Sequence, residues 1–198
     1  MRTVAGGRTG YSLIELLFAA GVTMALATAA LPLVRLSVSG TRALGAARYV
    51  GTRLQQARWE AVKRSAHVGF SFDPALAHRF AMYVDGDGDG LRTADIVSGT
   101  DRMLGTPERL SDNYPGVKFG VLEGVVAVES GEALGPSSDP IRLGPTDILS
   151  FGPLGTATSG TLYLHGENGE QYAVRILGGT GRVRVFRFRL ATGEWFTP

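Results

Sequence analysis

Cysteine is absent from this 198-residue chain, and histidine is scarce. Without cysteine the protein has no disulfide, no thiolate metal ligand and no cysteine nucleophile, although this leaves its redox compartment open. The three histidines, His67, His78 and His165, stand at unrelated spacings. The sequence also lacks a G-x-S-x-G nucleophile turn and a phosphate-binding loop with its lysine. We therefore do not expect an enzyme.

Net charge is small, at +2, but the charges are unevenly distributed. Residues 35–64 hold seven Lys or Arg and one acid, whereas residues 66–174 hold fifteen acids and six bases. The segment after residue 174 is basic again, with five arginines and one acid. Because the middle of the chain is acidic, this pattern argues against a general nucleic-acid binder.

Residues 16–34 form a run of nineteen residues without a charge. As a helix this run would span about 28 Å, close to the hydrocarbon thickness of a bilayer. Three interpretations compete: a signal peptide cleaved within the small residues 25–30, an uncleaved signal anchor, and a prepilin leader that is cut before the apolar run.

Glu15, at the head of this run, decides among them. An acid within a membrane costs roughly 2.5–3.5 kcal/mol at mid-bilayer and less near the end. Neither of the first two interpretations explains why it is there. If the chain is cut between Gly10 and Tyr11, the new α-amine lies four residues before Glu15, on the same helix face. The two charges could then neutralise each other, within one chain or between neighbours.

Residues 10–32, GYSLIELLFAAGVTMALATAALP, resemble the N-terminus of type IV pilins and type II secretion pseudopilins. The resemblance implies that a prepilin peptidase cuts after Gly10, that Tyr11 becomes N-methylated and that Glu15 serves assembly. Tyr11 departs mildly from the usual Phe. Pro32 falls where many family members have a helix-kinking proline.

Two later segments resemble the GspH/FimT branch of pseudopilins and minor pilins. They are ARYVGTRLQQARWEAVKRSAHVGFSF, residues 47–72, and, more loosely, the last 50 residues with DILSFGPLGTATSGTLYL and TGRVRV. The resemblance implies a chain with a leader at 1–10, a transmembrane and amphipathic helix at 11–65, and a β-rich head at 66–198.

The periodicity of the sequence supports this organisation. An apolar stripe predicts that the helix continues to residue 64 or 65: Leu44, Ala47, Val50, Leu54, Ala57 and Ala61. Alternating residues predict paired strands at 67–72 and 79–84, and weaker strands at 117–121 and 125–128. Asn168-Gly169 predicts a two-residue hairpin turn, followed by strands at 182–190 and 194–196. We expect an α+β fold, in which the long N-terminal helix packs on an antiparallel sheet or sandwich.

Asp85, Asp87 and Asp89, followed by Gly90, match the first half of an EF-hand calcium loop. The second half fails, because Asp95 stands at position 11, the closing position 12 is Ile96, and no exiting helix is evident. Two interpretations stay open. The loop is either a weak Ca²⁺ site or, as we favour, a solvated turn rich in Asp-Gly pairs. No cofactor is certain.

Four arginines follow Gly181: Arg182, Arg184, Arg187 and Arg189. The sequence GRVR resembles the tail motif of DNA-capturing FimT-type minor pilins, in which arginines bind phosphates. On a strand the first two arginines share one face and the last two the other, so a single stripe would need a bulge near Val185. We favour the alternative that they protect an exposed strand from edge pairing.

Two functions follow from these resemblances. The first is a minor pseudopilin or pilin of a type II secretion system or type IV pilus. Its partners would be other pseudopilins or minor pilins, the prepilin peptidase and the bacterial inner membrane, which it crosses once with the β domain in the periplasm before joining the filament. The second is a DNA-binding minor pilin for DNA uptake. One observation opposes a membrane orientation with the β domain in the periplasm. Three arginines follow the apolar run closely and only two precede it, whereas positive charge usually marks the cytoplasmic side.

Overall fold

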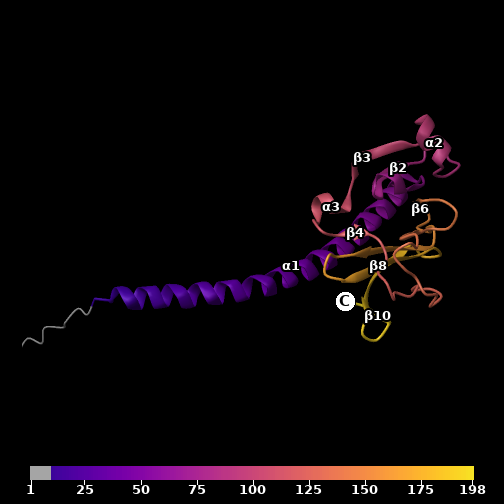
Figure 1. Cartoon of the computed structure of the whole chain (residues 1–198). Coiled ribbons are helices and arrows are strands. Elements are labelled where there is room, and N and C mark those ends of the chain that lie inside the picture. The colour runs from indigo at the N-terminus through magenta and orange to yellow at the C-terminus, as the bar shows by residue number, and fades with distance from the viewer. Residues whose placement is uncertain (1–9) are drawn as a thin grey trace, which may run out of the picture. The chain divides into compact units, whose positions relative to one another are not determined.

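The computed structural model describes the backbone of residues 10–198 and the side chains of residues 10–28 and 40–198. The chain divides after Val38 into two compact units, residues 1–38 and 39–198. Helix α1, Leu13–Arg64, is followed by ten strands and three short helices, so the fold is α+β, as predicted (Figure 1). Pro32 and the second half of the uncharged run lie outside the described side chains.

The first turn of α1 is capped by Ser12. Its Oγ accepts a hydrogen bond from the backbone N–H of Glu15 at 3.3 Å, and its carbonyl oxygen accepts one from the N–H of Leu16 at 3.2 Å. Ser12 and Glu15 thus have the S-x-x-E spacing of a capping box, in which the residue three positions after the cap is an acid or its amide. Sequence reasoning about Glu15 missed this spacing.

The side chains of residues 10–28 are all exposed, although most of them are apolar. The large ones have exposed fractions between 44% and 79%: Tyr11, Leu13, Ile14, Leu16, Leu17, Phe18, Val22, Met24 and Leu26. Within the described residues, no helical stretch combines the length and apolarity that a bilayer crossing requires.

In the second unit, α1 buries one face against the strands. The predicted stripe is confirmed, since Ala47, Val50, Leu54, Ala57 and Ala61 are all buried. The helix ends where predicted: Lys63 and Arg64 lie in its last turn, near the negative end of the helix dipole. Ser65 then takes a positive φ of 52°, which leaves the helical conformation.

The first sheet has the strand order β3-β2-β1-β6, with antiparallel neighbours. Its strands are β1 (Val68–Asp73), β2 (Arg79–Val84), β3 (Arg102–Glu108) and β6 (Ile148–Phe151). The predicted pairing of β1 with β2 is confirmed. A Cβ atom on Gly69 would lie 1.9 Å from the carbonyl oxygen of Leu149, so β1 and β6 approach each other closely at this glycine.

The second sheet has the order β10-β9-β8-β7-β4, and β5 also pairs with β7. Its strands are β4 (Lys118–Phe119), β5 (Ile141–Arg142), β7 (Gly160–His165), β8 (Gln171–Leu177), β9 (Arg182–Arg189) and β10 (Glu194–Phe196). The hairpin of β7 and β8 is present, but its loop is longer than predicted. The N–H of Gly166 bonds to the carbonyl of Glu170 at 2.9 Å, which leaves three residues between them.

Two further predictions are wrong. Residues 125–128 form no strand and make a single bridge, between Val126 and Ala133. A helix does follow the acidic loop: α2, Thr93–Ser98. The other short helices are η1 (Pro74–Leu76) and α3 (Leu110–Asn113).

The core has two parts, one on each side of the second sheet. The larger part lies between α1 and both sheets and contains Leu54, Phe70, Phe72 and Leu164. The smaller part lies under the segment 121–134, where Tyr163, Ala173 and Phe188 are buried. The second sheet is therefore covered on both faces.

Candidate functional site

The acidic loop between β2 and β3 is organised by Asp85, which is 8% exposed. One carboxylate oxygen accepts backbone N–H groups from Gly88 at 2.7 Å and Asp87 at 3.2 Å, and the other accepts the N–H of Gly90 at 2.9 Å. Burial alone would raise the pKa of Asp85, but these three donors outweigh it and hold the pKa below its ordinary value.

Asp101 closes the same loop from its far end, and sequence reasoning missed it. The residue is 2% exposed, and its carboxylate accepts the backbone N–H groups of Gly86 and Arg92, each at 3.2 Å. Its own N–H donates to the carbonyl of Asp95 at 3.0 Å. Little in the sequence identified Asp101 as part of the loop, because it stands outside the EF-hand spacing. Together the carboxylates of Asp85 and Asp101 accept five backbone N–H groups of the loop.

Three of the four predicted metal residues come together. One carboxylate oxygen from each of Asp85, Asp87 and Asp89 lies within 4.8 Å of the others, whereas Asp95 lies in α2 and does not join them. Asp89 forms an ion pair with Arg92. Desolvation raises the pKa of Asp89, Arg92 opposes the shift, and the charge of Asp87 adds to it. Three oxygens are at most half of the roughly six to eight ligands that Ca²⁺ takes, and calcium binding remains a prediction.

We expect Asp85→Ala to lower the free energy of unfolding by about 1–3 kcal/mol, because three loop N–H groups lose their acceptor. Since the folded pKa of Asp85 is lowered, its stabilisation is present above its ordinary pKa of about 3.9 and is lost as the pH falls through the folded value. Urea unfolding of the intact chain at a series of pH values measures both effects. Asp87→Ala, on an exposed neighbour, is the control and should change stability by less than about 0.5 kcal/mol. Equal losses in the two variants would contradict this account.

The four arginines of β9 lie on both faces of the second sheet. The pairing with β8 runs without a bulge from Gln171 opposite Phe188 to Leu177 opposite Arg182. Val183 and Val185 pack against the larger core and Phe188 lies in the smaller one, so the side chains alternate along the strand.

Arg182 and Arg184 therefore lie on the face of the smaller core, and Arg187 and Arg189 on the face of α1. The guanidinium of Arg187 lies 5.9 Å from the ring centroid of Tyr172, and that of Arg189 lies 4.7 Å from the centroid of Phe196. The structure does not gather the four arginines into one stripe.

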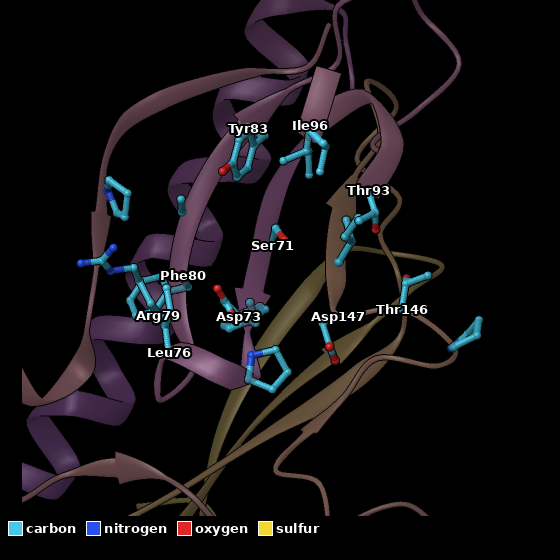
Figure 2. Close-up of a pocket in the computed structure, with 17 residues that line it drawn as sticks. Ser71, Asp73, Leu76, Arg79, Phe80, Tyr83, Thr93, Ile96, Thr146 and Asp147 are labelled. Carbon is cyan, nitrogen blue, oxygen red and sulfur yellow. The ribbon is translucent and has the colours of Figure 1, made fainter. Parts of the chain in front are cut away.

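A groove of about 620 Å³ lies on the outer face of the first sheet, between α2 and the loop before β6 (Figure 2). Ser71 and Tyr83 line it from the sheet, Ile96 from α2 and Asp147 from the loop. Burial, followed by the charge of Asp139, raises the pKa of Asp147. The described residues that line the groove include no histidine or lysine.

The predicted processing residues lie at the beginning of the described chain. Gly10 and Tyr11 precede α1, and Glu15 lies in its first turn. Tyr11 is 79% exposed. The bond between Gly10 and Tyr11 thus lies outside regular secondary structure.

A family model described as type II transport protein GspH matches residues 46–181. The match begins within α1, includes the whole first sheet and ends immediately before β9. It therefore includes neither the segment from Gly10 to Glu15 nor the arginines of β9. No curated protein and no solved structure gives a significant match. Because the matched segment is well over half of the chain, the protein belongs to the GspH family of type II transport proteins.

Proposed function

We propose that this protein is a minor pseudopilin. A prepilin peptidase cuts it after Gly10, its N-terminal helix holds it in the bacterial inner membrane with the β head in the periplasm, and it then joins other pseudopilins or minor pilins in a filament or tip complex. The GspH family is one of structural pseudopilins of the cell envelope, so membership supports a structural subunit rather than an enzyme.

The observation that carries the proposal is the exposed apolar surface of α1 between residues 13 and 28. A helix that is apolar around its circumference is stable where lipid or other protein covers it. Leu13, Leu17, Phe18 and Met24 are all at least 64% exposed among the described residues. Lipid before assembly and neighbouring helices after assembly would supply the missing contacts.

DNA capture is the second candidate, because the ion pairs among the described residues include none of the four β9 arginines. Their geometry does not favour it. Arg182 and Arg184 lie on the opposite face from Arg187 and Arg189, so one duplex could not contact all four from one side. The acidic middle of the chain adds repulsion.

Processing tests the proposal most directly. We expect the mature protein, isolated from membranes, to begin at Tyr11 and to carry one methyl group on its α-amine, since the short basic leader ends at Gly10. Mass spectrometry of the N-terminal peptide measures both features. The control is expression without a prepilin peptidase, which should leave the leader in place. A mature N-terminus between residues 28 and 31 would instead indicate an ordinary signal peptidase, and the proposal would be wrong.

A further inference from the structure

One edge of β9 is free over much of its length. Its inner side pairs with β8 from Arg182 to Phe188. On its outer side, β10 pairs with residues 187–189, and no strand among the described residues pairs with residues 182–186. Unpaired backbone groups on an exposed strand edge are a template for a further strand. This edge could therefore accept an extended segment of another chain.

A groove of about 410 Å³ runs beside this edge, between α1 and β9. Arg48, Gly51, Thr52 and Gln55 line it from the helix, and Val183 and Val185 line it from the strand. A Cβ atom on Gly51 would lie 3.6 Å from Val185 Cγ2 and 3.9 Å from Val183 Cγ1, so the glycine leaves the apolar floor open. The groove belongs entirely to the second compact unit.

Arginines stand at both ends of the groove. Arg48, Gly51, Gln55 and Arg58 follow one another at spacings of three and four, so they share one face of α1. At one end, Arg48 and Arg187 both act electrostatically on Tyr172, and Glu170 acts on it in the opposite sense. At the other end, the guanidinium of Arg58 packs against Gly155 and Gly181, immediately before β9.

At the end of the groove near Tyr172, two arginines stand against one acid, Glu170, so the positive charge there exceeds the negative charge. The ion pairs among the described residues include none of Arg48, Arg58 and Arg187. The groove therefore has an apolar floor, a free strand edge and positive charge at both ends. An extended segment with apolar residues and carboxylates complements all three features.

We propose that the groove between α1 and β9 binds an acidic, extended segment of a neighbouring subunit, which adds to the free edge of β9 as a further strand. The proposal rests on the assembly function, since it names the chemistry of the partner. It favours a polypeptide over a nucleic acid, because the floor formed by Val183 and Val185 suits apolar side chains, whereas a duplex is bound mainly through its charged phosphates.

Fluorescence anisotropy with the intact chain in detergent micelles tests this inference. The probe is a labelled eight-residue peptide in which glutamate alternates with valine and threonine. We expect binding that weakens as salt is added. The same peptide with lysine in place of glutamate should not bind, nor should a version with alternate N-methylated amides, which cannot pair as a strand. No binding of the glutamate peptide, or equal binding of the N-methylated one, would overturn the proposal.

Variants locate the binding surface. Arg48→Ala combined with Arg58→Ala should lower the affinity about tenfold. The matched control is Arg182→Ala with Arg184→Ala, which removes the same charge from the opposite face of β9 and should leave the affinity within about twofold. Gly51→Leu fills the groove without changing charge and should also lower the affinity. Equal effects of the two arginine pairs, or unchanged binding by Gly51→Leu, would overturn the proposal.

Two further measurements separate the alternatives. A short DNA duplex that binds more tightly than the peptide, and loses binding when Arg182 and Arg184 are replaced, would make this strand a nucleic-acid site. Peptide binding needs neither cleavage nor a membrane. Failure of the peptide in a protein whose mature form begins at Tyr11 therefore rejects the groove alone and leaves the assembly function standing.

Discussion

Glu15→Ala should be inserted and cleaved normally, yet be nearly absent from filament or tip complexes. In the proposed mature subunit, cut after Gly10, the α-amine of Tyr11 would lie four residues before Glu15, and the surrounding apolar side chains would exclude water once the helices pack. Removing one partner of a buried ion pair costs about 3–5 kcal/mol. Such a cost would lower incorporation by roughly two orders of magnitude or more. Co-purification of cross-linked partner subunits, normalised to protein in the membrane, measures this loss.

The structure supplies a competing explanation, and hence sharper controls. Glu15 stands three residues after Ser12, whose Oγ accepts the N–H of Glu15, so the acid could serve the helix cap alone. Glu15→Gln keeps a capping residue and removes the charge. Ser12→Ala removes the cap, at about 1 kcal/mol, and keeps the charge. We expect Glu15→Gln to fail like Glu15→Ala and Ser12→Ala to assemble. Normal assembly of Glu15→Gln would refute the role of the charge.

The parts of the fold that sequence could predict depend on local periodicity. The stripe containing Val50, Leu54 and Ala57 repeats every three or four residues, and the strands β1 and β2 alternate. These patterns arise because a helix or strand buries one face, and this regularity is visible along the chain. The alternation in β9 likewise predicts that Arg182 and Arg187 lie on opposite faces of the sheet. The pairing of β9 with β8, which has no bulge, agrees with this prediction.

The parts that sequence could not predict depend on contacts between distant residues. The segment 121–134 is irregular because its backbone groups bond to side chains from elsewhere. Gln171 accepts the N–H of Leu122 at 2.9 Å and donates to the carbonyl of Gly120 at 3.2 Å, and Trp195 donates to the carbonyl of Val126 at 2.8 Å. Such bonds replace a strand ladder, so the apolar run at 125–128 did not require one.

The acidic loop shows the same limit. The spacing of Asp85, Asp87 and Asp89 identified the cluster, since all three are close in sequence. Asp101 is sixteen positions beyond Asp85, and its place became visible only when β2 and β3 brought the two loop ends together. Helix α2 was missed for a related reason. Its six residues are too few for a clear periodic signal.

Leu54→Ala should destabilise the head more than any substitution considered above. Leu54 is 1% exposed in the larger core. It lines a cavity of about 10 Å³ together with Phe70 and Phe72 of the first sheet and Phe119 of the second. These rings also contact one another, since the centroids of Phe72 and Phe119 are 5.8 Å apart. Strands and rings held in this way collapse poorly around a new void, so we expect a loss of about 3–5 kcal/mol.

The loss should appear as a lower urea midpoint with an unchanged slope, measured by near-ultraviolet circular dichroism of the intact chain. Val62→Ala is the matched control, because it also shortens an aliphatic side chain on α1 but at a site that is 47% exposed. It should cost less than about 1 kcal/mol, since little apolar area leaves the core. Because Leu54 contacts rings from both sheets, its loss should loosen the head from the helix that carries it. Similar midpoints for the two variants would show that α1 is not the structural centre of the head.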